Sequence, residues 1–327
     1  MTESTAASRI CRICGNEKGN RTYNVREMLH GTREPFEYFE CADCGCVQIS
    51  EVPPDLGRYY PSDYQAYKSY ERRSRNWPRR IIDGARVGYA LTGKGILGRV
   101  AGALLPELDY VHWCRTAAIG RDHRILDFGC GAGKLLIRMM QGGFRHLEGA
   151  DPFIAADIRY PGVTICKTGL NELAERRKND FDFVMLHHSF EHIDHPVEVL
   201  RQLGALLADG GRLLLRIPVA SSYAWKHYRE NWYSLDPPRH LYLHTPDSLH
   251  RVAREAGMRI FAAEYDSTEM QFTMSELYSR DIPANAPAPE RDIISKAQRR
   301  AFAARAIELN REEQGDQAAF YLERLSG

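Results

Sequence analysis

Short β-rich runs recur along the second half of the chain, and stretches with helical spacing separate them. This alternation is typical of a doubly wound α/β domain built on a parallel sheet. The runs are RILD (124–127), HLEGADP (146–152), GVTICK (162–167), FDFVMLHH (181–188) and GRLLLRIP (211–218).

The first run leads into a glycine-rich loop. Asp127 ends the strand, and Gly129, Gly131 and Gly133 follow at alternate positions. Glycines at this spacing let the backbone turn tightly and pass close to a ligand. Dinucleotide oxidoreductases use a similar loop, but an acid before the glycines suits a cationic ligand end and disfavours a pyrophosphate. Asp151, which ends the second run, can accept the protons of both ribose hydroxyls.

Four histidines, His187, His188, His192 and His195, lie within the stretch LHHSFEHIDHP (186–196). His188 and His192 are four residues apart, a spacing that allows two side chains on one helical face to bind a metal. The alternatives are a general base, because the histidine pKa suits proton transfer near neutral pH, and simple packing.

Composition sets only broad limits on function. The chain has 327 residues, of which 43% are hydrophobic and 27% charged, and its formal net charge is +1. This length allows one large α/β domain and a smaller module, and the charge gives no reason to expect nucleic-acid binding. No apolar stretch approaches the roughly 18 residues of a membrane span, and no leader pattern is present, so we expect a cytoplasmic protein.

Cysteines are concentrated near the N-terminus. Two C-x-x-C-G turns place Cys11 with Cys14 and Cys41 with Cys44. Each turn offers two thiolates from one tight loop, which suits a tetrahedral, structural zinc ion. A disulfide pair fits a cytosolic chain poorly. Cys46 lies beyond the second turn and is expected to be a packing residue.

Charge differs between the segments that precede the α/β domain. Residues 1–58 form the predicted zinc-binding module, and acidic residues outnumber basic ones there, which disfavours RNA or DNA as a partner. Residues 59–119 form a tyrosine-rich connector followed by basic amphipathic helices. The part from 72 to 105 could contact a membrane surface or an anionic substrate, although a solvated helical face is the commoner explanation.

Four segments follow one another in an order that points to a known family: LDFGCGAG, GADP, FDFVMLHHSFEHIDHP and LADGGRLLLRIP. Over about residues 120–325 the chain resembles class I S-adenosylmethionine-dependent methyltransferases. With its cysteine module and tyrosine-rich connector, it is similar to bacterial zinc-containing sugar methyltransferases, which include nucleotide-sugar C-methyltransferases. The resemblance implies a Rossmann-like seven-stranded sheet, in which MRIFAAEYD (258–266) and QAAFYLERL (317–325) are the sixth and seventh strands and 270–314 is an insertion.

The resemblance also implies roles for the loop residues. The three glycines would lie under the methionine part of S-adenosylmethionine, with Asp127 near its ammonium group. Asp151 and Pro152 would contact the ribose, Gly169 and Leu170 the adenine, and His187 the cofactor. His192 matches a common histidine of the group and is a candidate base together with His188, whereas His195 is expected in a surface turn.

A second candidate base is His240, which occupies the family's histidine position before an aromatic strand and a Thr-Pro-capped helix. In the sugar C-methyltransferases the matching segment is Tyr-x-Glu-His, whereas here Pro237-Pro238-Arg239-His240 stands there. This departure favours an oxygen acceptor over a carbon acceptor. Arg239 could bind a phosphate or carboxylate, and Tyr67 of the connector is a candidate substrate contact.

The resulting expectation is an O-methyltransferase for a small polar acceptor, a sugar or sugar-derived metabolite in polysaccharide or natural-product synthesis. Carbon methylation of a nucleotide-sugar, RNA base methylation and a cofactor-binding scaffold without activity are the alternatives. The expected cofactors are S-adenosylmethionine and a structural zinc ion. The acceptor, the methylated atom and the oligomeric state stay open.

Overall fold

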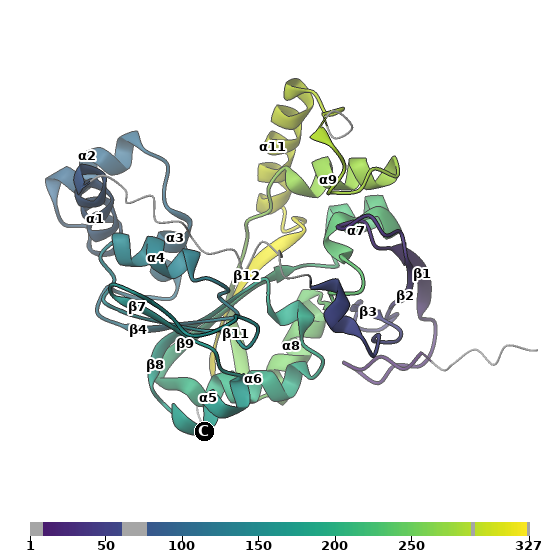
Figure 1. The fold of residues 1–327 in the computed structure, drawn as a ribbon, viewed down its shortest axis with the longest axis horizontal. Helices are drawn as coiled ribbons and strands as arrows, with labels where there is room; N and C mark the ends of the chain where they lie inside the picture. Colours follow the sequence, from purple (N-terminus) through teal and green to yellow (C-terminus); the bar gives the residue numbers. More distant parts are fainter. Residues whose placement is uncertain (1–8, 61–76, 289–291, 326–327) are drawn as a thin grey trace, which may run out of the picture.

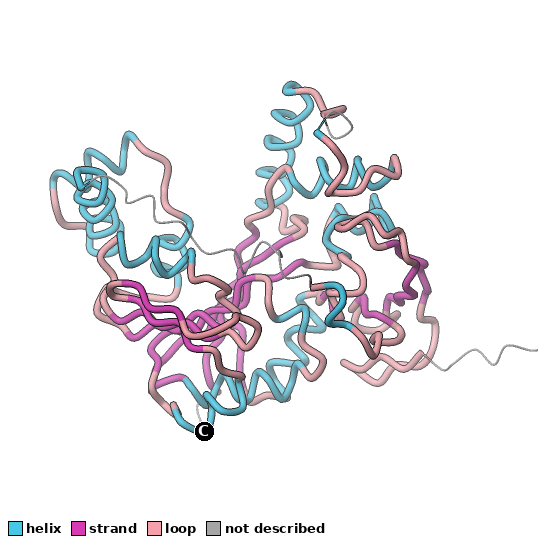
Figure 2. The backbone as a smooth tube through the Cα atoms, in the orientation of Figure 1, coloured by secondary structure: helices cyan, strands magenta, loops and turns pink. Residues whose placement is uncertain are grey.

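Two β-sheets organise the protein, one large and one small (Figures 1 and 2). The computed structural model describes residues 9–60, 77–288 and 292–325. The strands of the large sheet are β4 (Arg124–Phe128), β5 (His146–Ala150), β6 (Ile158–Tyr160), β7 (Val163–Cys166), β8 (Phe181–His187), β9 (Leu207–Pro218), β11 (Met258–Tyr265) and β12 (Gln317–Arg324).

The pairing of these strands defines the fold class. Their order is β11-β12-β9-β8-β4-β5-β7-β6. The central strands β7, β5, β4, β8 and β9 run parallel, and β12 lies antiparallel between β9 and β11. This confirms the predicted α/β seven-stranded sheet, including its sixth and seventh strands. β6 is an additional antiparallel edge strand that the sequence pattern did not predict.

Helices cover both faces of the large sheet (Figure 1). Leu136 and Met139 are buried in the apolar cluster on one face, and Leu203 and Val252 in the cluster on the other. Because both faces are covered, the carboxyl edge of the parallel strands is where a ligand can reach the sheet. The first face carries α3 (Asp109–Thr116) and α4 (Lys134–Gln141), and the second carries α5 (Leu170–Arg176), α6 (Pro196–Leu206) and α8 (Pro246–Glu255).

A helical hairpin projects beside the first face. It consists of α1 (Trp77–Thr92) and α2 (Ile96–Leu104), and α2 exposes a row of apolar side chains that includes Ile96 and Leu104. Within the described ranges, every helix is too short or too polar to cross a membrane. Peripheral membrane contact through 72–105 stays a prediction.

The small sheet joins the N-terminal module to the α/β half. It has the order β1-β2-β3-β10, in which β1 (Arg21–Arg26), β2 (Pro35–Glu40) and β3 (Val47–Ile49) are N-terminal and β10 (Tyr242–Leu243) comes from the α/β half. Side chains reinforce this pairing, because the Tyr38 hydroxyl donates to the His240 carbonyl at 2.8 Å and the Thr245 hydroxyl donates to the Cys44 carbonyl at 2.6 Å. The N-terminal module therefore helps to position the segment that carries His240.

The segment 270–314 also packs against the N-terminal module. It contains α9 (Met270–Ser279) and α11 (Lys296–Arg311). Phe272 stacks on Phe302 with ring centroids 5.1 Å apart, and both helices contribute side chains to the apolar core of the N-terminal module. The insertion is thus anchored on that module.

A buried ion pair crosses between the module and the α/β half. Arg239 and Glu27 are each fully buried, with 3.0 Å between guanidinium and carboxylate. The Arg239 guanidinium also donates to both carboxylate oxygens of Asp236. Removal of the guanidinium would leave two carboxylates without their cation, which is strongly unfavourable in a buried place.

We predict that Arg239→Met lowers the free energy of unfolding by about 3 to 5 kcal/mol in urea titrations. Arg251 is the matched control, because it also joins the two parts through Asp43 but lies at the surface. Arg251→Met should leave the unfolding midpoint nearly unchanged. Equal effects of the two substitutions on the free energy of unfolding would contradict a larger contribution from the buried ion pair than from the surface pair.

Candidate functional site

The glycine-rich loop lies at the carboxyl end of β4, where the sequence places the cofactor. Gly129, Gly131 and Gly133 all have positive φ, at 76°, 54° and 74°. A Cβ on Gly129 would lie 2.5 Å from the Ser189 hydroxyl, and one on Gly133 would lie 2.3 Å from a methyl group of Ile165. Only glycine fits this path, so the loop keeps its backbone close to the strand ends.

Two buried carboxylates flank the loop. Asp127 is 3% exposed and Asp151 is 4% exposed. The Asp151 carboxylate accepts from the backbone N–H of Gly131 at 2.9 Å and from that of Phe153 at 2.8 Å. Asp127 Oδ1 has no hydrogen-bond partner within the described part of the chain. Burial, together with the nearby charge of Asp151, raises the pKa of Asp127 to about 8.

This pair of acids fits S-adenosylmethionine. An ammonium group of a ligand would give the unpartnered Asp127 oxygen a hydrogen-bond donor. Its positive charge would also offset the repulsion between the Asp127 and Asp151 carboxylates. Both oxygens of Asp151 accept from backbone N–H groups. The ammonium contact of Asp127 and the ribose contact of Asp151 stay predictions.

Other predicted cofactor contacts lie along the same edge. His187 ends β8, and its ring lies against Trp113 with centroids 4.5 Å apart. Burial and the charges of Arg216 and His188 hold the His187 pKa well below its usual range, so this imidazole is neutral. Its Nε2 is buried and lacks a hydrogen-bond partner among the residues described, which leaves one polar atom for a ligand.

The predicted adenine contacts follow β7. Gly169 is the N-cap of α5, and the buried Leu170 is the first residue of that helix. Pro152 directly follows Asp151, and Phe153 is 75% exposed. These residues follow the neighbouring parallel strands β5 and β7, and their contacts with the cofactor stay predictions.

The histidine stretch after β8 does not form one helical face. His188 has a positive φ of 50°, residues Phe190–His192 form a 3₁₀ turn, and α6 begins only at Pro196. The helix that follows therefore starts at the last residue of the stretch, Pro196, and His188 and His192 do not share a helical face. His195 is exposed at the N-cap of α6, as expected of a surface turn.

Folding brings His192 and His240 together around a buried acid, Glu191. The two imidazole rings are 4.7 Å apart, and His240 Nε2 lies 3.8 Å from the Glu191 carboxylate. We call Glu191, His192 and His240 the Glu-His-His cluster. One ligand atom from each of the three lies within 4.8 Å of the others. Glu191 was not among the residues predicted from the sequence, although an acid directly before a candidate histidine was a signal for it.

Protonation differs among the members of the cluster. Burial opposes ionisation of Glu191, but His188 at 3.5 Å and the imidazoles of His240 and His192 outweigh it and lower its pKa to about 2. Burial and the neighbouring His192 lower the His240 pKa to about 4. At neutral pH the carboxylate is ionised while the His240 ring is neutral.

His188 stands beside the cluster with both ring nitrogens directed at charged groups. Its Nε2 lies 2.7 Å from the Arg216 guanidinium, and Nδ1 faces Glu191. Arginine is only a donor, so Nε2 accepts and its lone pair is occupied. This placement leaves His188 less suited to proton transfer than His192.

Tyr60 connects the cofactor side with the cluster. Its ring lies parallel to that of Phe153, with centroids 6.5 Å apart, and its hydroxyl is 3.0 Å from His192 Nδ1. The Glu-His-His cluster therefore lies next to the loop that follows Asp151. Tyr67, the predicted substrate contact, lies outside the described residues.

Arg239 does not face this site. Its guanidinium is 0% exposed and is held by Glu27, Asp236 and the Tyr59 carbonyl. A phosphate would have to displace these partners, so the structure argues against the predicted substrate contact. Arg239 instead joins the two parts of the protein.

Four cysteines of the N-terminal module converge as the sequence predicts. The Sγ atoms of Cys11 and Cys44 are 3.6 Å apart, those of Cys14 and Cys41 are 3.5 Å apart, and all four lie within 4.8 Å of one another. Such separations fit tetrahedral ligands at about 2.3 Å from a zinc ion. Gln48 donates to Cys11 Sγ at 3.1 Å, a contact that favours a thiolate. The buried Cys46 belongs to the apolar core and not to this four-cysteine cluster.

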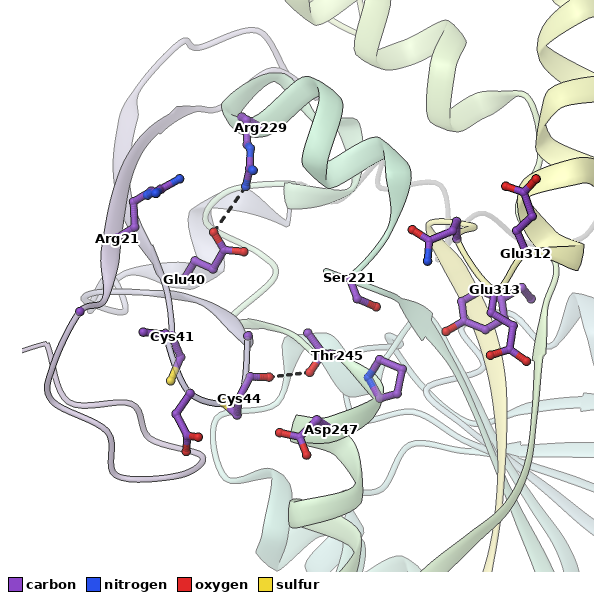
Figure 3. Close-up of a pocket in the computed structure, with 17 residues that line it drawn as sticks. Arg21, Glu40, Cys41, Cys44, Ser221, Arg229, Thr245, Asp247, Glu312 and Glu313 are labelled. Carbon is purple, nitrogen blue, oxygen red and sulfur yellow. Dashed lines mark hydrogen bonds and ion pairs between the residues drawn. The ribbon is translucent and has the colours of Figure 1, made fainter.

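A groove of about 910 Å³ lies between the four-cysteine cluster and the end of α11 (Figure 3). Carboxylates of Asp247, Glu312 and Glu313 line it. The predicted cofactor residues, by contrast, lie elsewhere, at the carboxyl edge of the large sheet. The groove is a separate feature from the candidate site.

The fold and the loop define the class of this protein. Residues 103–263 match the family model described as a methyltransferase domain, which is just under half of the chain. Together with the strand order, this match shows that the chain carries a class I S-adenosylmethionine-dependent methyltransferase domain.

Individual relatives are distant. The chain is 33% identical over 106 residues to a tRNA U34 carboxymethyltransferase of Cellvibrio japonicus, covering 29% of this chain and 32% of that one. It is 29% identical over 136 residues to a ubiquinone biosynthesis O-methyltransferase of Xanthomonas oryzae pv. oryzae, covering 36% and 53%. The chain thus spans about half, or less, of the length of these relatives.

Solved structures are similarly distant. A SAM-dependent methyltransferase from Archaeoglobus fulgidus is 18% identical, with a TM-score of 0.39, and the match covers 66% of this chain and 99% of that one. The strand order of the sheet, rather than this likeness, defines the fold.

We predict that Gly129→Ala weakens S-adenosylmethionine binding at least tenfold in calorimetric titrations and costs about 1 to 3 kcal/mol of stability. The new Cβ would collide with Ser189, and alanine disfavours the positive φ. Gly102→Ala is the control, because nothing lies within 4 Å of the point that a Cβ would occupy there. Unchanged binding by Gly129→Ala would contradict the placement of the cofactor over this loop.

Proposed function

We propose that the protein transfers a methyl group from S-adenosylmethionine to an oxygen of a small polar acceptor, a sugar or sugar-derived metabolite. The single observation that carries the proposal is the unpartnered Asp127 oxygen at the glycine-rich loop, near the cluster in which His192 and His240 meet Glu191. The acceptor class is supported by the resemblance to zinc-containing sugar methyltransferases.

In this proposal the residues around the loop hold the cofactor. Asp127 binds the ammonium group, Asp151 the ribose, and His187 contributes its neutral ring. S-adenosylmethionine, when bound, supplies a methyl group already activated by the sulfonium charge. The remaining task of the protein is to align the acceptor oxygen and to promote loss of its proton.

The Glu-His-His cluster is the place proposed for that second task. His192 is only half-buried, and its Nδ1 lies 2.9 Å from the Arg239 carbonyl, so Nδ1 carries the proton and Nε2 carries a lone pair. With the cofactor bound, the acceptor proton would pass to His192 Nε2 as the acceptor oxygen takes the methyl group, and S-adenosylhomocysteine would be the leaving group. His240, whose pKa is about 4, is a weaker proton acceptor.

The test is release of S-adenosylhomocysteine from a panel of nucleotide-sugars, free glycans, phenols and tRNA transcripts. We expect turnover with a carbohydrate, and methylation at oxygen by mass spectrometry. His192→Ala should lower kcat at least about 100-fold while the Kd for S-adenosylmethionine stays the same. His195→Ala, in the neighbouring exposed position, should have no effect.

Other outcomes separate the alternatives. Exchange of an acceptor C–H in heavy water would indicate carbon methylation, and salt-sensitive turnover of tRNA alone would indicate RNA methylation. Either result, or no turnover with any carbohydrate, would contradict the proposed acceptor.

We also propose that the four-cysteine cluster holds a structural zinc ion. Four thiolates leave no open coordination position, so the metal contributes folding energy rather than chemistry. Because β3 pairs with β10, the same ion would stabilise the segment that carries His240.

We predict that Cys44→Ser contains one equivalent of zinc less than the wild type by elemental analysis and unfolds at a lower temperature. Cys46→Ala is the control, since this buried thiol lies outside the cluster, and it should keep the full zinc content. Equal zinc content in Cys44→Ser and the wild type would contradict the assignment.

A further inference from the structure

The Glu191 carboxylate is buried beside histidine rings and forms no hydrogen bond within the described ranges. The residue is 1% exposed, and neither carboxylate oxygen has a hydrogen-bond partner in the described ranges. The nearest ring nitrogens are His188 Nδ1 at 3.5 Å and His240 Nε2 at 3.8 Å. A buried charge in such a place is costly unless a cation or several donors meet it.

The two imidazoles of the cluster present lone pairs, not protons, to the space beside this carboxylate. His192 Nδ1 lies 2.9 Å from the Arg239 carbonyl, and His240 Nδ1 lies 2.7 Å from the Ser234 carbonyl. A carbonyl only accepts, so both Nδ1 atoms are donors, and in neutral rings both Nε2 atoms carry lone pairs. A backbone carbonyl on the far nitrogen is the arrangement that orients metal-binding histidines.

An ion pair with His240 would not give the Glu191 carboxylate a hydrogen bond. If His240 were charged, its Nε2–H would still be 3.8 Å from the Glu191 carboxylate and 3.8 Å from the Asp236 carboxylate. Both distances exceed those of a hydrogen bond. Asp236 is also already bound to Arg239 through both oxygens. Three electron-pair donors thus converge with no proton between them.

We infer that Glu191, His192 and His240 bind a divalent transition-metal cation, at a site distinct from the four-cysteine cluster. Two imidazoles and one carboxylate suit Zn²⁺, Co²⁺, Fe²⁺ or Mn²⁺. The ligand atoms lie within 4.8 Å of one another, whereas neighbouring ligands at about 2.1 Å from a tetrahedrally coordinated metal are about 3.4 Å apart. Cation binding therefore requires the three side chains to close together by up to about 1.4 Å.

The position of this site suggests its use. Ser189, which meets the glycine-rich loop at Gly129, stands two residues before Glu191, and Tyr60 links His192 to the loop after Asp151. Three protein ligands leave coordination positions open for a water or an acceptor hydroxyl. Coordination lowers the pKa of such a hydroxyl, so in the metal-bound protein its proton would pass to solvent instead of to His192, whose Nε2 is then a ligand. This role rests on the proposed function, whereas cation binding itself does not.

The test is titration of the full chain, loaded with a single equivalent of zinc for the four-cysteine cluster, with Co²⁺, followed by visible absorption. We expect one Co²⁺ per chain with weak bands and no thiolate charge-transfer band, because zinc keeps the thiolates. Glu191→Gln and, as a second variant, His192→Ala should each raise the Kd for Co²⁺ at least tenfold. Glu198→Gln, on the exposed side of α6, is the matched control and should bind Co²⁺ like the wild type.

Two results would overturn the inference: no Co²⁺ uptake beyond the cysteine site, or equal affinity in the wild type and both variants. Circular dichroism spectra check that the variants are folded. S-adenosylmethionine binding by the same samples reports separately on the proposed function, because the Asp127 side of the site contains no ligand of the cation. Loss of Co²⁺ binding with intact cofactor binding in the variants is the expected result.

Discussion

The carboxylates of Asp127 and Asp151 are the constraint on which the rest of the site depends. Both are buried at the ends of neighbouring strands, and they destabilise each other when both are ionised. Backbone N–H groups donate to the Asp151 carboxylate, whereas one Asp127 oxygen lacks a hydrogen-bond partner among the described residues, so ionisation of Asp127 needs a cation. The glycines keep the backbone out of the space that such a ligand would fill. A cationic nucleoside meets both conditions, because it brings a positive charge to Asp127 and can fill the space beside the glycines.

A second constraint acts across the chain. The N-terminal module supplies three strands of the small sheet, and the α/β half supplies the fourth. Arg239, buried between Glu27 and Asp236, fixes the segment next to His240. The module therefore acts on the candidate site by position rather than by contact with the cofactor. This explains why four cysteines far from the glycine-rich loop can matter for the geometry at His240.

Local patterns predicted most of the fold and the position of the glycine-rich loop with its two acids. The strands that follow one another along the chain, the loop after β4 and the acid after β5 are features of short segments, so spacing was enough to place them. The Glu-His-His cluster was not predicted as a unit, because it joins residues about 50 positions apart and depends on β10 pairing with β3. Arg239 was misjudged for the same reason. A sequence shows that an arginine can bind an anion, but not that Glu27 already occupies it.

The most direct test of the account is the titration of the Asp127 carboxyl carbon by ¹³C NMR, with Asp127→Asn to assign the signal. In the free protein the account predicts a pKa near 8, because burial and the Asp151 charge favour the neutral acid. With S-adenosylhomocysteine bound, the ammonium group should lower that pKa by more than about one unit. An Asp127 that titrates in the ordinary range of an aspartate, or whose pKa does not change when the ligand binds, would contradict the central claim.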